Sequence, residues 1–575
     1  MEFTKLSGGT VGLVGTAAVL LAVFSTFSHA QPRPDAGSVL EGTKQPAIAP
    51  RPGADILPRV QEPRPALGAP GLKVVVTAFK VSGNTLFPES VLLETVTEFV
   101  GKEQTIDGLN DAATKVRAYY RERGYFLVQA YLPQQEIKGG VIEIAVIEAR
   151  IGKVALNFKE GTRFSESLVR GIIEVHLKQG DIITENALET PLLLLNDFPN
   201  AVVTSEIKPS QTVGAADLTV HVSDTPGWIS GSVQADNFGN RFTGAIRTSL
   251  NVNVNSPMSL GDQLSYNALV SDERMGLNRL GYVFPLGPWG TRVGVSYTSF
   301  HYRLGRDFLS DQLHGVGALT AIAVFHPVIR TRGANVILQA SYDDKSLNDR
   351  NESIQSIEDR TITGTHVGVV GDLRDGLLGG GLNSFAYTLT EGNALILSPL
   401  AFAVDQAVGV GRLTHGRFSR HNYEFRRLQK ITDNATLLLA LQGQFASKNM
   451  MSAEKFSLGG ASGVRAYPAG EALGDSGAVF QAEFRYNIPG LKLVGGDVSL
   501  TGFWDQGWVR LNQDQLPTDA ANERRLSGYG IGASIGKDAD FLLRATAAWR
   551  NENEAPTSDT ARRTPRVWVQ AIKWF

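Results

Sequence analysis

Two short motifs place an arginine and an aspartate where they can form a buried ion pair. Arg465 lies in the sequence VRAY, within a long loop that precedes an expected strand at 476–487. Asp505 lies in the sequence FWDQG, where strand alternation puts Asp505 and Phe503 on one face and Trp504 on the other. A guanidinium matches a carboxylate in two parallel hydrogen bonds, and partial burial strengthens such a pair. Spacing alone also allows two independent solvated charges.

The candidate site consists of the residues of these two motifs. They are Val464, Arg465, Ala466 and Tyr467 in the loop, and Phe503, Asp505 and Gly507 in the strand. We expect the loop to fold back so that the arginine meets the aspartate.

The other residues give no sign of catalysis. The sequence has no GxxxxGK[ST] phosphate loop, no HExxH motif and no cysteine. Ser462 stands between glycines but not in GxSxG, and only a flexible loop is expected there. Asp343 and Asp344 are expected at a strand end beside Lys345, as a solvated ion cluster. We therefore predict no enzyme activity, no cofactor and no metal site.

The elements that position the two motifs are strands. From Trp228 to Phe575 the chain alternates between apolar and polar residues in segments of roughly 8–12 residues, as in 479–487. A soluble sandwich also alternates, but a lipid-embedded barrel adds charges on its lumenal face and aromatic residues near strand ends. The fold class predicted for 227–575 is a transmembrane β-barrel of about 16 antiparallel strands.

Loop lengths support this prediction. The connections after even strands are short, as at 257–261 and 376–381, whereas those after odd strands include the two longest, 393–417 and 447–476. We expect the lid loop of the barrel at about 447–475. The chain ends in an alternating strand with Trp574 and Phe575, the kind of ending that the outer-membrane assembly machinery recognises.

The N-terminal part predicts export. Residues 1–30 read as a signal peptide, with Lys5, an apolar run at 11–27 and small residues before a cleavage site after Ala30. The apolar run is short for a membrane anchor. Residues 31–71 hold nine of the 25 prolines and predict a linker in which only 35–42 is able to form a short helix.

Two small α+β modules are expected between the linker and the barrel. Residues 72–150 and 151–226 each predict the order β-α-α-β-β. The alternative is one α+β domain of about 150 residues. The formal net charge of -2 gives no reason to expect a nucleic-acid partner.

The two charged motifs resemble those of a superfamily of outer-membrane insertases and transporters. Residues 464–467 resemble its VRGY lid-loop motif, with Ala466 in place of the usual glycine, and 503–507 resemble its FxDxG strand motif. The resemblance implies that Arg465 docks on Asp505 inside the barrel lumen.

The N-terminal modules look like polypeptide-transport-associated (POTRA) domains. Residues 81–85 and 119–125 resemble the first strand-turn and a helix end of a POTRA domain, and 195–202 and 214–218 resemble the second POTRA domain of two-partner secretion transporters. Residues 35–38 resemble the start of that family's N-terminal helix, which can occupy the pore, with 51–71 as its linker.

Two POTRA domains before a barrel identify the chain as a member of the two-partner secretion transporters, of the haemolysin and filamentous-haemagglutinin exporter type. Membership implies an outer-membrane location with periplasmic POTRA domains. It also implies that an unfolded exoprotein, a large β-helical adhesin, haemolysin or toxin, docks on the POTRA domains and leaves through the barrel. Outer-membrane lipid and the barrel-assembly machinery are the other implied partners.

Other functions of a barrel protein fit the sequence less well. A barrel-assembly insertase of the same superfamily is the main one, but insertases commonly have three or five POTRA modules and this chain has room for two. A diffusion porin needs no periplasmic extension, and a siderophore receptor carries a plug domain. Neither the cargo nor the docking residues on the POTRA domains follow from the sequence.

Overall fold

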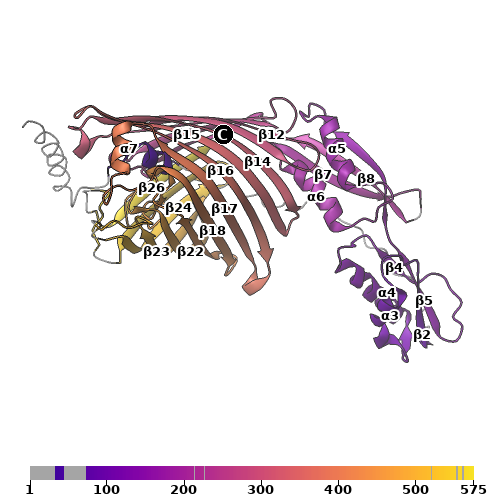
Figure 1. The fold of residues 1–575 in the computed structure, drawn as a ribbon. Helices are drawn as coiled ribbons and strands as arrows, with labels where there is room; N and C mark the ends of the chain where they lie inside the picture. The colour runs from indigo at the N-terminus through magenta and orange to yellow at the C-terminus, as the bar shows by residue number, and fades with distance from the viewer. Residues whose placement is uncertain are drawn as a thin grey trace, which may run out of the picture.

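The structure is a computed structural model in which residues 33–43, 73–212, 214–225, 227–517, 519, 521–551, 554–559 and 563–575 are described. The expected signal peptide and most of the expected linker lie outside the described residues. Two small α+β units stand at one end of a large barrel (Figure 1). Among the described helices, none combines the length and apolar character needed to cross a membrane.

Within the described residues, sixteen strands form the barrel. They are β9 (Ile229–Asp236), β10 (Arg247–Asn255), β11 (Gln263–Ser271), β12 (Gly276–Pro285), β13 (Arg292–Arg303), β14 (Leu313–Arg330), β15 (Ala334–Asn351), β16 (Ser356–Asp375), β17 (Gly381–Ile396), β18 (Gly416–Lys430), β19 (Ala435–Ala446), β22 (Ser476–Leu493), β23 (Gly496–Arg510), β24 (Glu523–Lys537), β25 (Phe541–Arg550) and β26 (Arg566–Trp574). Each pairs with the next, and β26 pairs with β9 to close the ring. The predicted fold class, an antiparallel barrel of about 16 strands, is confirmed.

The strands differ in length around the ring. β14 and β15 have 18 residues and β16 has 20, whereas β9 has 8 and β26 has 9. The closing pair is correspondingly short, since five residues of β26, Gln570–Trp574, pair with β9. Phe575 and Gly231 then exchange backbone hydrogen bonds of 2.9 and 3.0 Å at the end of this seam.

One sequence expectation about the barrel is wrong. Asp343 and Asp344 lie inside the long strand β15 and not at its end. Asp343 faces inward, 3.3 Å from the Lys345 ammonium and 3.0 Å from the His366 ring, while Asp344 is exposed on the other face. Polar residues occur on both faces here, so the simple apolar and polar alternation hides the continuation of the strand.

The first α+β unit contains β1 (Lys73–Val75), β2 (Ala78–Ser82), α3 (Glu89–Glu94), η1 (Thr97–Phe99), β3 (Glu103–Thr105), α4 (Ile106–Arg121), β4 (Gln129–Tyr131) and β5 (Val141–Ile147). Its main sheet has the order β2-β5-β4, and β1 pairs with β3. The first extended segment of this unit is therefore divided into β1 and β2. At the break, the Thr77 amide donates to the Gly140 carbonyl at 2.8 Å.

The second unit contains β6 (Arg150–Phe158), α5 (Glu166–His176), α6 (Glu185–Asn196), β7 (Ala201–Pro209) and β8 (Ala215–Asp224). Its sheet has the order β6-β8-β7. Phe126 and Leu127 of the first unit pack against the core of the second. The two units therefore contact each other through apolar side chains.

The second unit also packs against the nearest barrel turns. Asp197, just after α6, accepts two hydrogen bonds from Arg330 of β14, at 2.6 and 2.8 Å, and the Arg330 side chain is 3 % exposed. Leu194 of α6 fills the space beside Gly290, where a Cβ would come within 2.5 Å of the leucine. Charge pairing and apolar packing therefore hold α6 against this rim of the barrel.

Candidate functional site

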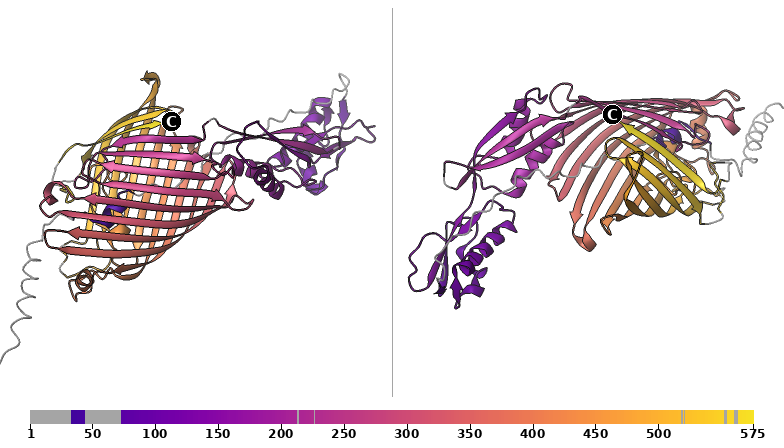
Figure 2. Two further views of the ribbon diagram at one scale, coloured as in Figure 1. Left: turned by 90° about the horizontal axis from the view of Figure 1, so that it is seen from above. Right: turned by 180° about the vertical axis from the view of Figure 1, so that it is seen from behind.

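The interior of the barrel holds two segments that are not wall strands. One is the lid loop, residues 447–475 between β19 and β22, which contains η4 (Ser452–Glu454), β20 (Phe456–Ser457) and β21 (Leu473–Gly474). The other is α2 (Ala36–Glu41), which we call the plug helix. Figure 2 shows this indigo helix surrounded by the barrel strands.

Arg465 of the lid loop is docked on the barrel wall. Its Nε and Nη2 atoms donate to the two carboxylate oxygens of Asp505 at 2.9 and 2.7 Å, and its backbone amide donates to the same group at 3.0 Å. The guanidinium carbon lies 3.5 Å from the centre of the Phe503 ring. Asp505 has no exposed surface, so this is a buried fork-to-fork pair with an aromatic floor.

Two further residues complete the surroundings of Arg465. Its Nη1 atom donates to Glu483 of β22, and the Trp568 indole of β26 donates to the Arg465 carbonyl at 2.7 Å. Neither residue was predicted from the sequence. Both lie far from Arg465 along the chain, and no motif connects them to it. Arg465 thereby contacts three wall strands, β22, β23 and β26.

The neighbours of Arg465 are buried with it. Val464, Ala466 and Tyr467 have exposed fractions of 0, 3 and 0 %. They belong to an apolar cluster between loop and wall whose other members include Leu458, Val479, Val509 and Leu526. Next to them, around the exposed Ser462, Gln442 and Gln481 of the wall donate to the carbonyls of Ser462 and Gly463 at 3.3 and 2.8 Å.

Glycines on β23 and β24 make room for the loop tip. A Cβ on Gly507 would lie 3.0–3.3 Å from Leu458, Val464 and Val479, and a Cβ on Gly528 would overlap the Ala466 methyl group. Ala466 itself does not have a positive φ angle, so the alanine that replaces the family's glycine causes no backbone strain here. The sequence departs from the motif at a position that tolerates a methyl group.

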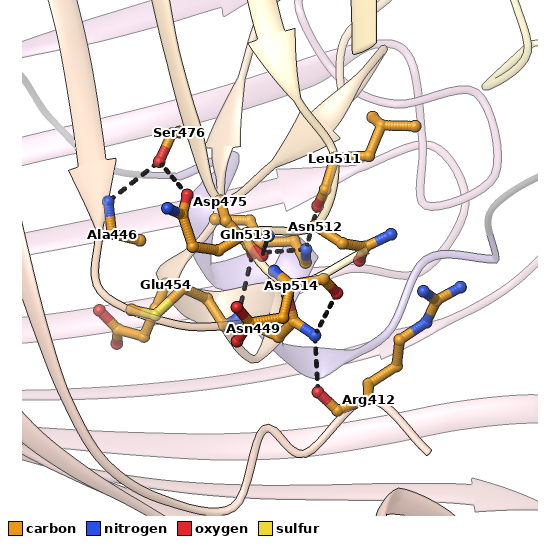
Figure 3. A network of polar contacts seen from close by, with 12 residues as sticks. Arg412, Ala446, Asn449, Glu454, Asp475, Ser476, Leu511, Asn512, Gln513 and Asp514 are labelled. Atoms are coloured by element: carbon orange, nitrogen blue, oxygen red, sulfur yellow. Dashed lines mark hydrogen bonds and ion pairs between the residues drawn. The ribbon is translucent and has the colours of Figure 1, made fainter. Parts of the chain in front are cut away.

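The two ends of the lid loop are fixed by polar contacts with the loop between β23 and β24 and with the loop between β17 and β18 (Figure 3). The Asn449 side chain donates to the carbonyls of Arg412 and Asp514 at 2.8 and 3.0 Å and accepts from the Asp514 amide at 2.8 Å. Asp475, which is fully buried, accepts from the Gln513 amide at 2.7 Å and from Lys455 at 2.6 Å. These residues were also missed from the sequence.

The plug helix is capped and anchored by one aspartate. Asp35 accepts from the Ser38 amide at 2.9 Å, and the Ser38 hydroxyl accepts from the Asp35 amide, which forms a capping box. The Asp35 carboxylate also lies 3.0 Å from Arg360 of β16 and accepts from Ser452 of the lid loop at 2.7 Å. The helix expected at 35–42 is present, and its cap ties it to both wall and loop.

Helix and lid loop meet in a tight contact beside a buried charge cluster. Gly37 packs directly on Ser452 and Ala453, so closely that a Cβ would overlap both. Next to them, Glu454 lies 2.6 Å from Lys345 of β15 and 2.9 Å from Arg420 of β18. Each of these three residues is at most 7 % exposed. The cluster anchors η4, on which the helix rests.

The remaining predicted residues lie at the seam. Trp574 is the last residue of β26, and Phe575 pairs through its backbone with Gly231 of the first barrel strand while its side chain stays 58 % exposed. The described residues contain no group of three or more side chains arranged to hold a metal ion.

These features define a class: an outer-membrane transport barrel with POTRA domains at one end and a lumen filled by a docked loop and a helix. A family model described as "Haemolysin secretion/activation protein ShlB/FhaC/HecB" matches residues 214–535, more than half of the chain. The chain belongs to this family. A second model, described as "POTRA domain, ShlB-type", matches residues 74–149.

Similar proteins cover nearly the whole chain. The heme/hemopexin transporter protein HuxB of Haemophilus influenzae (strain 86-028NP) is 26 % identical over 98 % of this chain and 99 % of its own length. The outer membrane transporter CdiB of Dickeya dadantii (strain 3937) is 23 % identical over 76 % of each chain. The structure of CdiB from Escherichia coli matches over 100 % of both chains, with 20 % identity and a TM-score of 0.68, which shows a shared fold.

Membership confirms the predicted class, location and function. The chain is an outer-membrane transporter of the two-partner secretion type, with POTRA domains in the periplasm and a barrel through which a partner exoprotein is secreted. The family is a transporter family, in agreement with the absence of catalytic motifs from the sequence.

Proposed function

We propose that this transporter is closed at rest by the plug helix together with the lid loop, and that it exports a large β-helical exoprotein of the adhesin, haemolysin or toxin class. The observation that carries the proposal is the contact between the two lumenal segments, in which Asp35 joins Ser452 of the loop and Arg360 of the wall. A chain cannot pass while both segments fill the lumen, so the helix must leave before transport.

The lid loop supplies a fixed inner surface in this proposal. Arg465 and Asp505 are positioning residues that keep the loop against β23 while the exoprotein passes. Their pair is buried and bidentate, and the loop tip has further contacts with β22 and β26. Loss of the pair would free the loop to move into the pore.

The exoprotein is proposed to dock first on an open sheet edge of the POTRA domains. β7, with nine residues, lies at the edge of its sheet, and β8 is its one partner among the described strands. An unfolded segment can add to such an edge through backbone hydrogen bonds, which provide affinity without a strict sequence requirement. The relative HuxB is described as a heme/hemopexin transporter protein. A heme/hemopexin-related exoprotein is therefore a second class of cargo to test with this transporter.

Two other partners follow from the barrel. The exposed apolar side chains of its outer face, such as Leu280, Tyr297 and Ile322, suit outer-membrane lipid. Trp574 and Phe575 are proposed as the signal read by the barrel-assembly machinery. The family match assigns transport and not insertion, so the insertase alternative has no separate support.

The proposal is tested by secretion in cells that produce the full chain together with a candidate exoprotein. Exoprotein in the medium, dependent on the transporter, is the expected result. Accumulation of the exoprotein in the periplasm despite an assembled barrel, for every class of cargo tried, would contradict the proposed cargo range. Heat-dependent migration of the barrel on gels reports assembly independently of transport.

A further inference from the structure

Side-chain amides and hydroxyls form a continuous strip along one face of β9, β10 and β11. We call this strip the amide ladder. Its members are uncharged and polar, and they are Ser230, Ser232, Gln234, Ser249, Asn251, Asn253, Asn255, Gln263, Ser265 and Asn267. The strands pair in register, so that Asn251 lies between Ser232 on one side and Asn267 on the other. The ladder therefore crosses three neighbouring strands without a break.

The packing of these strands places the ladder on the lumenal face. Leu250 and Tyr266, from the alternate positions of β10 and β11, are 37 and 41 % exposed and belong to the apolar outer face. Leu269 is two residues from Asn267 and shares its face. It packs against the buried cluster that includes residues of the plug helix. Asn267 and the rest of the ladder therefore face the lumen.

The ladder differs in charge from the wall that holds the lid loop and the plug helix. The lumenal cations that pair with those two segments are Lys345, Arg360 and Arg420. The ladder itself has no charged member, and charges occur only at its borders. Asp236 pairs with Arg247 at 2.9 Å at the extracellular end, and Arg279 of β12 lies opposite Asn267. The ladder is thus an uncharged lane beside a charged wall.

Part of the ladder has unused hydrogen-bonding capacity. Asn255, at the periplasmic end, donates to Ser230 at 3.1 Å and accepts from Gln263 at 2.8 Å. The side chains of Asn253 and Asn267 are partly exposed and have no hydrogen-bond partner within the described parts of the chain. A side-chain amide offers N–H donors and a carbonyl acceptor, which are the groups that a polypeptide backbone also carries. Both asparagines can therefore exchange hydrogen bonds with a chain in the lumen.

The periplasmic end of the ladder lies where the second POTRA domain meets the barrel. The Ser165 amide of that domain donates to the carbonyl of Ser259, in the turn between β10 and β11, at 2.9 Å. Phe198 of the same domain packs on Gly261 of this turn, where a Cβ would lie 2.7 Å from the ring. The ladder therefore starts on the side of the barrel entrance at which the POTRA domains stand (Figure 1).

An uncharged polar surface suits a moving chain of variable sequence. Hydrogen bonds between neutral groups replace similar bonds to water, so each is only weakly favourable and is easily exchanged. Charged side chains would retain segments of opposite charge and repel segments of like charge. An apolar surface would retain apolar side chains. Passage through a pore needs contacts that are weak and repeated, and the ladder provides such contacts.

We propose that the unfolded exoprotein crosses the barrel along the amide ladder, with its backbone in exchanging hydrogen bonds with Asn253 and Asn267. This inference rests on the proposed function and adds the route and the chemical group that is recognised. The ladder recognises the backbone, which every exoprotein shares, and not a particular sequence. The charged wall holds the lid loop and the plug helix and makes fewer contacts with the cargo.

The test arrests an exported exoprotein in the lumen by fusing its C-terminus to a domain that folds in the periplasm. The exoprotein is the one whose secretion depends on this transporter in the experiment above. A photoreactive benzoylphenylalanine replaces Asn267 of the full chain or, in the matched control, Gln339 of β15. Gln339 is also partly exposed and shares the lumenal face of Asp343. We expect at least fivefold more cross-linked exoprotein from position 267 than from position 339.

Charge substitution supplies a second measurement. Asn267→Asp places an anion in the ladder and should slow secretion of the unfused exoprotein at least threefold. Gln339→Glu places the same charge on the other wall and should secrete at the wild-type rate. Heat-dependent gel migration shows that each variant barrel is assembled.

The outcomes separate the route from export itself. Equal cross-linking from the two positions, or more from position 339, would overturn the route and leave export in place. Equal slowing by Asn267→Asp and Gln339→Glu would also overturn it, because any lumenal charge would then have the same effect. No cross-link from either position and no exoprotein in the medium, despite an assembled barrel, would overturn the proposed export and the route together.

Discussion

Gly37 of the plug helix lies against Ser452 of the lid loop so closely that any side chain on Gly37 would overlap the serine hydroxyl. The absence of a Cβ is therefore a condition for docking the helix. Because Ser452 also donates to Asp35, the same few atoms set both the fit and the polar attachment of the helix.

The first prediction concerns this contact. Gly37→Leu should displace the plug helix from η4 and increase the frequency of open-channel events in planar bilayers severalfold, because the lumen loses one of its two occupants. Gly42→Ala is the matched control. A Cβ on Gly42 meets only atoms of its own helix, at 3.5 and 3.6 Å, so its conductance should equal that of the wild type. Equal conductance of all three proteins would refute the plug role.

The second prediction concerns the buried arginine. Arg465→Ala leaves the carboxylates of Asp505 and Glu483 without their shared cation, and breaking a buried pair typically costs roughly 3–5 kcal/mol. Secretion should fall by at least tenfold, while barrel assembly stays largely intact. The measurement is exoprotein in the medium, normalised to heat-modifiable barrel.

Arg510→Ala is the control for that experiment. Arg510 lies on β23, the strand that carries Asp505, and forms an exposed ion pair with Glu523 of β24 at 3.8 Å. Exposed pairs contribute little to stability. Unchanged secretion by Arg465→Ala would exclude the proposed role of the docked loop.

The third prediction tests the fit of the loop tip. Gly528→Ala should push Ala466 away from β24 and destabilise the docked loop by about 1–3 kcal/mol. Faster cleavage of the lid loop by added protease is the expected signal. The double variant with Ala466→Gly should restore much of the protection, since it removes the methyl group that clashes. Gly502→Ala has no neighbour within 4 Å and should cleave like the wild type.

The fourth prediction concerns a buried glutamate in the first POTRA domain. Glu148 accepts from the amides of Thr85 and Leu86, at 2.9 and 3.0 Å, and from the Tyr120 hydroxyl at 2.8 Å. Burial alone would raise the pKa of Glu148, but the hydrogen bonds from these residues outweigh it and lower the pKa. Its ionised form therefore stabilises the domain.

The sign of the pH dependence follows. A carboxyl whose pKa is lower in the folded state contributes its full stability above the unfolded-state value of 4.5 and loses it as the pH falls through the folded value. The protection of the amides of residues 85–148 against hydrogen exchange, relative to their intrinsic exchange rates, should fall in the full chain below pH 4.5. Glu148→Ala should remove the acid sensitivity of this segment and cost on the order of 2 kcal/mol at neutral pH. The exposed Glu136→Gln should change neither quantity.

The fifth prediction concerns the attachment of the second POTRA domain. Arg330→Ala should widen the distribution of spin-label distances between α6 and the barrel, because Asp197 loses both of its hydrogen bonds to this arginine. Arg279→Ala, which changes an exposed residue of β12 with no ion pair among the described residues, serves as the control. An unchanged distribution for Arg330→Ala would show that the pairs of Arg332 with Glu185 and Glu189, together with apolar packing at Leu194, suffice.

The strand pattern of the barrel was predictable because alternation is a local property. Phe503 and Asp505 share a face in any strand that includes them, whatever the rest of the chain does. The pairing of Arg465 with Asp505 could be predicted for a different reason. The two motifs occur together in one superfamily of outer-membrane proteins. Asp505 was therefore found through resemblance and not through spacing.

Contacts that depend on three-dimensional closure were out of reach. Glu454 meets Lys345 and Arg420 across the lumen, and no sequence interval relates these three residues. The helix at 35–42 was expected from its residues, but its place beside Ser452 was not. The error at Asp344 has another cause, because polar residues on both faces of β15 remove the alternation that marks a strand.

The unequal strand lengths have a consequence for the lipid. With a rise of about 3.3 Å per residue and a tilt near 40°, the 20 residues of β16 reach a height of about 50 Å, and the 8 residues of β9 reach only about 20 Å. An apolar belt of about 25 Å is usual for such barrels. We therefore expect the bilayer to thin beside β9 and β26, at a cost of a fraction of a kcal/mol for each ångström of mismatch. On this expectation the outer membrane is thinnest where the ring closes.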